Sequence, residues 1–108
     1  MPIVSVAKDF TRFPAGRYKS KGSTSGEAFR ELFLEGPISR GETVTVNFDG
    51  TVGYGSSFLE EAFGGLVRKL GLPADYVIRH LVLNASDTSI CDEVREYIHD
   101  AAVANSRA

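Results

Sequence analysis

The stretch VTVNFDGTVGYGSSFLEEAFGGLVRKL, residues 44–70, changes its hydrophobic period part-way along. Its first residues alternate between apolar and polar, with Val44, Val46 and Phe48 on one side, and this period of two predicts a strand over residues 42–48. After a glycine-rich loop, apolar residues recur at the spacing of an amphipathic helix: Leu59, Ala62, Phe63, Leu66, Val67 and Leu70. The change of period predicts a strand, a loop and a helix in succession.

The start of this helix carries a capping signal. Ser57 and Glu60 fit the capping-box pattern, so we expect Ser57 at the N-cap, Glu60 as its capping carboxylate and Glu61 as a surface acid. Gly64 and Gly65 lie inside the helix, where each glycine costs about 1 kcal/mol relative to alanine. We therefore expect the helix to approach the backbone of a sheet closely at this point.

Other segments predict further strands. Residues 3–7 are a short apolar run, and residues 76–83 are apolar on both faces, as in an interior strand. With a short extended piece at residues 17–19, the sheet would have about four strands. Because helices separate these strands along the chain, parallel crossovers are expected. The predicted fold class is a small α/β domain with a mixed or parallel sheet and three main helices packed on it.

The other two predicted helices also have terminal signals. Thr24 opens a second capping box, and the helix that follows should end at Gly36-Pro37. Its buried face is predicted from helical spacing to consist of Phe29, Leu32 and Phe33. The last helix should be capped by Ser86 or Asp87, and its apolar positions are Ile90, Val94, Tyr97, Ile98 and Ala101.

Length and composition indicate one soluble domain over residues 1–108, with residues 105–108 as a frayed tail. Cys91 is the single cysteine, so it has no internal disulfide partner, and no Cys/His spacing indicates a metal. We expect Cys91 to be buried as a small hydrophobe. The sequence has no signal-peptide pattern and no long apolar run. A cytoplasmic protein that binds neither a membrane nor a cofactor is therefore expected.

Charge is distributed unevenly. The net charge of −2 does not indicate a nucleic-acid binder. Between residues 12 and 21 there are nevertheless four cations and no acid. Arg12, Arg17 and Lys19, together with Arg30, are candidate ligands for a phosphate or a nucleotide, and a solvated basic loop is the alternative.

Two serines follow the glycine-rich loop. Ser56 and Ser57 should lie at a helix N-terminus, where unpaired amides and a partial positive charge stabilise a bound or covalently attached phosphate. The alternative is that they serve only as a cap and a loop residue. The loop matches neither a Walker motif nor G-x-S-x-G, and neither His80 nor His99 lies in a catalytic context. We therefore do not expect an enzyme.

The sequence resembles a known family. The residues that carry the resemblance are Gly16-Arg17, Ser25-Gly26-Glu27, Phe29-Arg30, residues 46–50 and above all residues 56–66, SSFLEEAFGGL. Over about residues 3–84 the chain resembles the STAS-like domain of unknown function, a family of small bacterial and phage-borne proteins. It is more distantly similar to STAS domains of anti-sigma factor antagonists. In those domains a partner kinase, which is also the anti-sigma factor, phosphorylates the first serine of an Asp-Ser-Ser-Gly-Leu turn.

The resemblance implies a role for each matching position. Ser56 falls on the phosphoacceptor and Ser57 on the second serine, whereas Gly55 replaces the aspartate and Phe58 replaces the glycine. It implies a non-enzymatic regulatory module that binds a protein partner such as a kinase-like ATPase. The expected docking face is formed by Gly53, Tyr54, Gly55 and an exposed Phe58.

Three alternatives stay open from the sequence. The chain could bind a phosphate-bearing ligand or nucleotide, act as an enzyme with a serine nucleophile, or be a phage-type inhibitor that docks on a host protein. The sequence does not indicate an oligomeric state.

Overall fold

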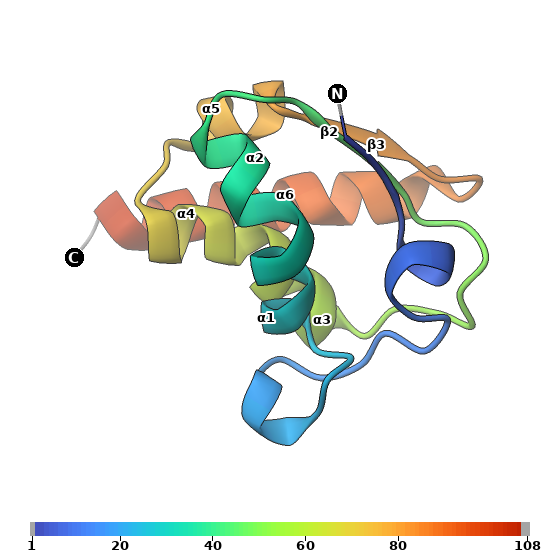
Figure 1. Cartoon of the computed structure of the whole chain (residues 1–108). Coiled ribbons are helices and arrows are strands. Elements are labelled where there is room, and N and C mark those ends of the chain that lie inside the picture. The colour runs from blue at the N-terminus through green and yellow to red at the C-terminus, as the bar shows by residue number, and fades with distance from the viewer. Residues whose placement is uncertain (1, 107–108) are drawn as a thin grey trace.

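The computed structural model describes residues 2–106. Strands β1 (Ile3–Ser5), β2 (Val44–Asn47) and β3 (Leu81–Asn84) form a parallel sheet in the order β1-β2-β3 (Figure 1). The α/β class and the parallel crossovers agree with the sequence prediction. Within the described residues, however, the sheet has three strands rather than about four. The extended piece expected at residues 17–19 leads instead into the 3₁₀ turn η2 (Lys19–Lys21), which is not paired with the sheet.

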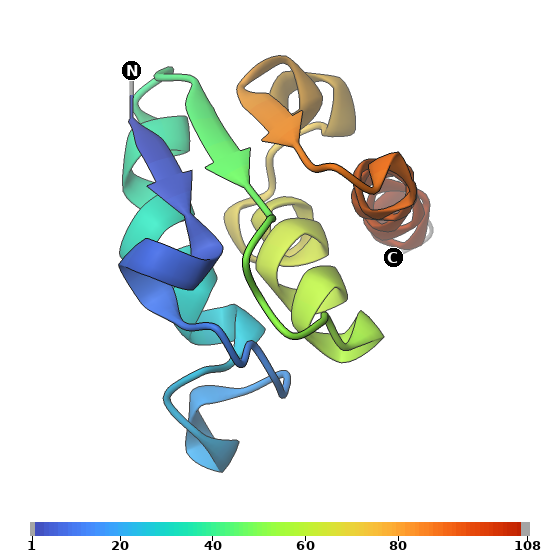
Figure 2. The ribbon, with the colours of Figure 1, turned by 90° about the vertical axis from the view of Figure 1, so that its right-hand side faces the viewer.

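The helices cover one face of this sheet. Both crossovers advance in the same direction across the sheet, and right-handed crossovers of that kind place their helices on the same side. Val46 and Leu81 point to this side and are buried. The opposite face of the sheet is turned toward the viewer in Figure 2. Ile3, Thr45 and Val82 are register neighbours on that face, and Ile3 is 74% exposed.

Helix one is continuous from Gly26 to Ser39 and consists of α1 (Gly26–Phe29), the π-helical turn η3 (Arg30–Leu34) and α2 (Glu35–Ser39). Its N-cap is Ser25, whose Oγ accepts a hydrogen bond from the amide of Ala28 at 3.2 Å, so the predicted cap at Thr24 is one residue early. The helix also continues through Pro37. This proline lies in the first turn after η3, where the π turn already interrupts the regular α-helical hydrogen bonds. The missing N–H of the proline therefore destabilises the helix little at this position.

The π-helical turn changes which side chains of helix one are buried. Phe29 is buried as predicted, but Leu32 is 67% exposed, and Leu34 and Ile38 are buried in its place. A π turn contains an extra residue, which rotates the following side chains relative to the spacing of a regular α-helix. The prediction of Leu32 as a core residue was therefore wrong.

Helix two runs from Ser56 to Leu70 as α3 (Ser56–Leu59), the π-helical turn η4 (Glu60–Gly64) and α4 (Gly65–Leu70). The predicted helix is confirmed, and Gly71 ends it with a φ of +70°. Its N-cap is Gly55, and no side chain in the described part of the chain caps it. The predictions of Ser57 as N-cap and Glu60 as capping carboxylate were therefore wrong.

The last part of the chain differs from the prediction at its start. Helix α5 (Ala74–Arg79) occupies much of the strand predicted over residues 76–83, because the extended backbone of Pro73 initiates a helix there. The remaining strand, β3, lies at an edge of the sheet rather than inside it.

Helix α6 (Thr88–Ser106) packs beside helix two. The predicted cap is confirmed, because the Asp87 carboxylate accepts from the Ser89 amide at 3.0 Å. Of the tail expected at residues 105–108, Asn105 and Ser106 belong to α6, and residues 107–108 lie outside the described residues.

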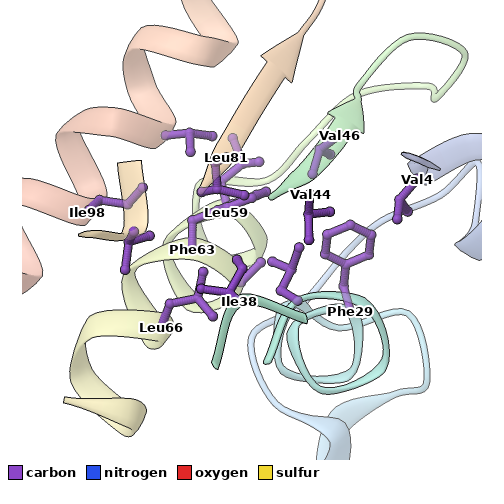
Figure 3. Packing of buried hydrophobic residues seen from close by; sticks show 14 of the residues in the cluster. Val4, Phe29, Ile38, Val44, Val46, Leu59, Phe63, Leu66, Leu81 and Ile98 are labelled. Carbon is purple, nitrogen blue, oxygen red and sulfur yellow. The ribbon is translucent and has the colours of Figure 1, made fainter. Parts of the chain in front are cut away.

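One cluster of buried hydrophobic side chains, part of which is shown in Figure 3, connects the three strands with helices α1 to α6. It extends from Val4 in β1 to Ala101 in α6. Aromatic rings form much of its centre, and the rings of Phe48 and Phe63 are 5.7 Å apart. Cys91 is buried as predicted, and burial raises the pKa of the thiol. None of the helices described is long and apolar enough to cross a bilayer.

Candidate functional site

The start of helix two presents two hydroxyl groups to solvent. Ser56 and Ser57 are both exposed, and they follow the loop that leaves the carboxyl end of β2. The first amide of the helix to find a backbone acceptor is that of Leu59, which donates to the Gly55 carbonyl at 3.2 Å. The preceding amides of the helix point toward the N-terminal end, where they favour a negative charge.

Phe58 is not part of this exposed surface. Its side chain is fully buried, and its ring lies 5.8 Å from that of Phe29 and 6.0 Å from that of Tyr54. Because the helix begins at Ser56, Phe58 falls on the same helical face as Ala62, which points into the core. The expectation of an exposed Phe58 was wrong, and Phe58 does not contribute to a docking face of the folded chain.

The loop before helix two is anchored from inside. The Tyr54 hydroxyl donates to the Phe48 carbonyl at 2.7 Å, and burial raises the pKa of Tyr54 to about 12. Gly50 and Gly53 have φ values of +97° and +151°, which other residues rarely adopt. The loop therefore has a defined shape, and Gly53 and Gly55 lie on its exposed side.

A second segment lies beside this loop. The Val52 amide donates to the Arg12 carbonyl at 2.9 Å, which brings residues 11–13 next to the loop. Val52 is 68% exposed and Phe13 is 61% exposed. We call Arg12, Phe13 and residues 52–57 the candidate docking surface; its large exposed apolar side chains are those of Phe13 and Val52, not that of Phe58.

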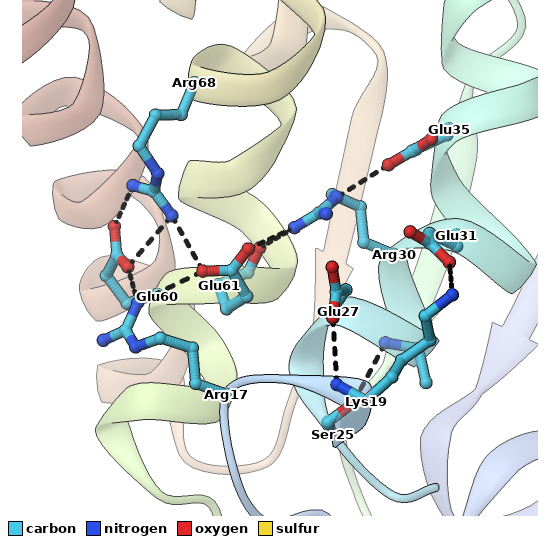
Figure 4. Close-up of polar contacts among 11 residues, drawn as sticks. Arg17, Lys19, Ser25, Glu27, Arg30, Glu31, Glu35, Glu60, Glu61 and Arg68 are labelled. Atoms are coloured by element: carbon cyan, nitrogen blue, oxygen red, sulfur yellow. Dashed lines mark hydrogen bonds and ion pairs between the residues drawn. The ribbon is translucent and has the colours of Figure 1, made fainter. Parts of the chain in front are cut away.

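The four cations expected to bind an anion do not form one open site. Arg12 is exposed and has no ion pair with any residue between 2 and 106. Lys19 pairs with Glu31, with 2.5 Å between Nζ and Oε1, and Arg17 pairs with carboxylates of helix two (Figure 4). Arg30 is buried. Three of the four candidate ligands therefore already have carboxylate partners.

Arg30 and Glu61 form the centre of a buried charge cluster. Arg30 Nη1 donates to the Glu61 carbonyl at 2.7 Å and to its Oε2 at 2.8 Å, while Nε donates to Glu35 Oε2 at 2.7 Å. Glu61 is 1% exposed, so its prediction as a surface acid was wrong. The glycine pair was the signal in the sequence, because a Cβ on Gly65 would overlap the Arg30 guanidinium. Gly64 faces the Tyr97 carbonyl of α6, so the close approaches involve Arg30 and a helix rather than the sheet.

Glu60 extends this cluster to the surface. It pairs with Arg17 and with Arg68, whose Nη1 lies 2.6 Å from Glu60 Oε2. Arg68 Nη2 also lies 3.1 Å from Glu61 Oε1. Burial raises the pKa of Glu60, but the hydrogen bonds from Arg68 and Arg17 outweigh that effect and lower the pKa overall.

The two histidines do not accompany the serines. His80 directly precedes β3, so it lies at the amino ends of the parallel strands, whereas the serines follow the carboxyl end of β2. The His80 ring stacks on that of Tyr76, with 4.1 Å between the ring centres. His99 is exposed on α6. No group of three metal-ligating side chains occurs in the part of the chain that the structure describes.

The comparison with protein families identifies this architecture. A family model described as a STAS-like domain of unknown function matches residues 25–89, which contain helix one, β2, helix two and β3. The chain belongs to this STAS-like family. The match includes the two serines and the Arg30–Glu61 pair, whereas Arg17 lies before it.

Part of the chain is also similar to a segment of a longer plant protein. The chain is 37% identical over 65 residues to Berberine bridge enzyme-like 28 of Arabidopsis thaliana. This match covers 60% of the chain but 12% of the plant protein, so the chain corresponds to a small part of it. No solved structure matches the chain.

Proposed function

We propose that this STAS-like domain is a non-enzymatic regulatory module that binds a protein partner through the candidate docking surface. The observation that carries the proposal is the hydrogen bond from Val52 to the Arg12 carbonyl, because it brings the exposed side chains of Phe13 and Val52 to the same loop. Exposed apolar groups that are gathered beside polar ones are typical of protein interaction sites. The partner that fits the family resemblance is a kinase-like ATPase.

Phosphorylation of Ser56 or Ser57 is the proposed switch. The serine Oγ attacks the γ-phosphorus of ATP held by the partner, ADP leaves, and the hydroxyl proton passes to solvent. The product carries about −1.5 to −2 charges at neutral pH, and the amides at the start of helix two stabilise that charge. A charge of this size at the candidate docking surface changes the affinity for the partner.

The candidate docking surface is tested by substitution. Phe13→Ser and Val52→Ser should each weaken binding of the kinase-like ATPase about tenfold, as expected for an apolar interface residue worth about 1.4 kcal/mol. Leu32→Ser is the matched control, because Leu32 is equally exposed but lies on helix one. Equal binding by all three variants would contradict the proposal.

The switch is tested by intact-mass measurement after incubation with the ATPase and ATP. The wild type should gain the mass of one phosphate, and Ser56→Ala combined with Ser57→Ala should abolish the gain. Phosphorylation that persists in the double variant would place the modification elsewhere.

One observation supports the alternative of a phosphate-bearing ligand. Arg12 is exposed next to the loop that leads into helix two, because its carbonyl accepts the Val52 amide, and it is not paired with a carboxylate within residues 2–106. A nucleotide that raises the melting temperature of the wild type but not of Arg12→Ala would favour this function. The docking experiment then shows whether a protein partner uses the same surface.

A further inference from the structure

Residues 15–23, which we call the strap, lie across the start of helix one. The amides of Gly26 and Glu27 donate to the carbonyls of Gly16 and Arg17, each at 3.0 Å, and the Ala15 amide donates to the Thr24 carbonyl at 3.1 Å. Arg17 is half-buried, and the other side chains of the strap are exposed. Polar contacts rather than apolar packing therefore hold the strap in place.

The Arg17 side chain connects the strap to helix two. Its Nη1 pairs with Glu60 Oε1 and lies 3.3 Å from Glu61 Oε1, while the Arg17 carbonyl accepts the Glu27 amide (Figure 4). One residue thus contacts the first turn of helix one and the second turn of helix two. Because the Arg17 side chain is 33% exposed, it has room to move.

The charges around Arg17 are balanced. The cluster contains three cations and three carboxylates: Arg17, Arg30 and Arg68, with Glu35, Glu60 and Glu61. Arg30 and Arg68 belong to the helices themselves, whereas Arg17 comes from the strap. Arg17 and Arg68 are the two half-exposed cations of the cluster, and only a shift of Arg17 toward added negative charge would act on the strap.

The two serines lie within reach of this cluster. The Glu60 amide donates to the Ser56 carbonyl, so Glu60 lies one helical turn after Ser56, and Glu61 follows Ser57 at the same spacing. Side chains four residues apart are neighbours on a helix surface. A phosphate on either serine would therefore come close to the carboxylates that hold Arg17.

We propose that Arg17 couples the start of helix two to the strap: a phosphate on Ser56 or Ser57 draws Arg17 into a charge-assisted hydrogen bond and tightens the strap over helix one. Guanidinium and phosphate groups form strong hydrogen bonds of this kind. The inference rests on the proposed function in taking these serines as the place where the charge arrives. Arg17 is then a positioning residue: phosphorylation at the start of helix two changes, through Arg17, how firmly the strap is held on helix one.

Amide hydrogen exchange of the isolated chain tests this coupling. The chain is prepared with phosphoserine incorporated at position 56 during synthesis, so no kinase is needed. Exchange at Gly26 and Glu27, whose amides donate to the strap, should slow about fivefold relative to the unmodified chain. The Ala28 amide, which donates to the Ser25 side chain, is the internal reference and should change less.

Variants of the strap assign the effect. Arg17→Gln should speed exchange at Gly26 and Glu27 and remove the response to phosphoserine, and Arg17→Lys should restore part of the response. Lys21→Gln, which removes an exposed cation of the same strap, should leave exchange and response unchanged. These variants keep the buried cluster formed by Arg30, so they should remain folded.

An unchanged exchange rate with phosphoserine, or a response that persists in Arg17→Gln, would overturn the inference. The measurement needs no partner, so its result is independent of whether Phe13 and Val52 bind the ATPase. Loss of docking with an intact exchange response would contradict only the proposed function, and the reverse result would contradict only the coupling.

Discussion

Arg30 and Glu61 lie 31 residues apart in the sequence and form an ion pair of 2.8 Å in which both residues are 1% exposed. Removing two charges from water is costly, and such a pair is tolerated when its geometry is good and its other polar atoms are satisfied. Here the Glu35 carboxylate and the Glu61 carbonyl accept further hydrogen bonds from the Arg30 guanidinium. Every buried polar side-chain atom in residues 2–106 has a hydrogen-bond partner. The pair joins helix one to helix two.

Arg30→Met should destabilise the chain by about 3 kcal/mol, because it leaves the Glu61 carboxylate buried without its main partner. Arg95→Met is the control: Arg95 pairs with Asp92 at the surface of α6, with 3.4 Å between Nη1 and Oδ1, and its loss should change stability by less than about 0.5 kcal/mol. Urea unfolding followed by circular dichroism measures both. Equal midpoints for the two variants would show that the buried pair is not needed for stability.

The crossing of the two helices depends on a glycine. A Cβ on Gly26 would overlap the Phe58 carbonyl, which is backbone and cannot move aside cheaply. Gly26→Ala should therefore destabilise the chain by about 1–3 kcal/mol or force the helices apart. Gly55→Ala is the matched control, because its Cβ would meet nothing within 4 Å and its φ of −75° suits alanine. The control should be neutral or slightly stabilising in the same unfolding measurement.

Substitutions of Phe58 and Val52 should have different effects, the first on the stability of the fold and the second on partner binding. Phe58→Ala removes a fully buried ring and should cost about 3–5 kcal/mol in thermal or urea unfolding. Val52→Ala removes an exposed side chain and should leave the unfolding midpoint nearly unchanged while weakening partner binding. A stable, folded Phe58→Ala protein with lost binding would instead restore Phe58 to the docking face.

Stability should fall in acid, in part because of Glu60. The pKa of Glu60 is lowered from 4.5 in the folded chain, so the group stabilises the fold above that pH and this contribution is lost as the pH falls through the lowered value. Glu60→Gln should reduce stability at neutral pH and make its decrease below pH 4.5 shallower. Some decrease should remain, because hydrogen bonds also lower the pKa values of Asp49 and Asp87.

Glu96→Gln is the control for this experiment, because Glu96 is exposed on α6. Its unfolding free energy should follow the wild-type pH dependence. If Glu60→Gln also follows the wild-type curve throughout the acid range, Glu60 does not contribute to the acid sensitivity.

The hydrophobic patterns determined which segments are helical or extended in most of the chain. The period of two over residues 42–48 and the helical spacing from Leu59 to Leu70 are local properties, and both segments have the predicted structure. The cap of α6 at Asp87 is also local, because a carboxylate reaches an amide two residues away. Such features can be read from neighbouring residues alone.

Predictions failed where distant parts of the chain compete for the same residue. Residues 76–79 have strand-like composition, but Pro73 and the packing of Tyr76, whose hydroxyl donates to the Ile38 carbonyl at 2.7 Å, place them in a helix. Leu32 has the spacing of a core residue, and the π turn moves it to the surface. The spacing of a regular α-helix differs from that of the π turn by one extra residue, so Leu32 does not lie on the buried face that regular spacing predicts.

Neighbouring residues are enough to predict the α/β class, the helix that carries the serines, and a family resemblance centred on residues 56–66. The folded chain is needed to show that Phe58 faces the core, that Glu61 pairs with Arg30, and that Val52 lies beside Arg12. The physical reason is that burial and charge pairing depend on which distant segments share the same space. Composition and spacing describe only neighbours along the chain.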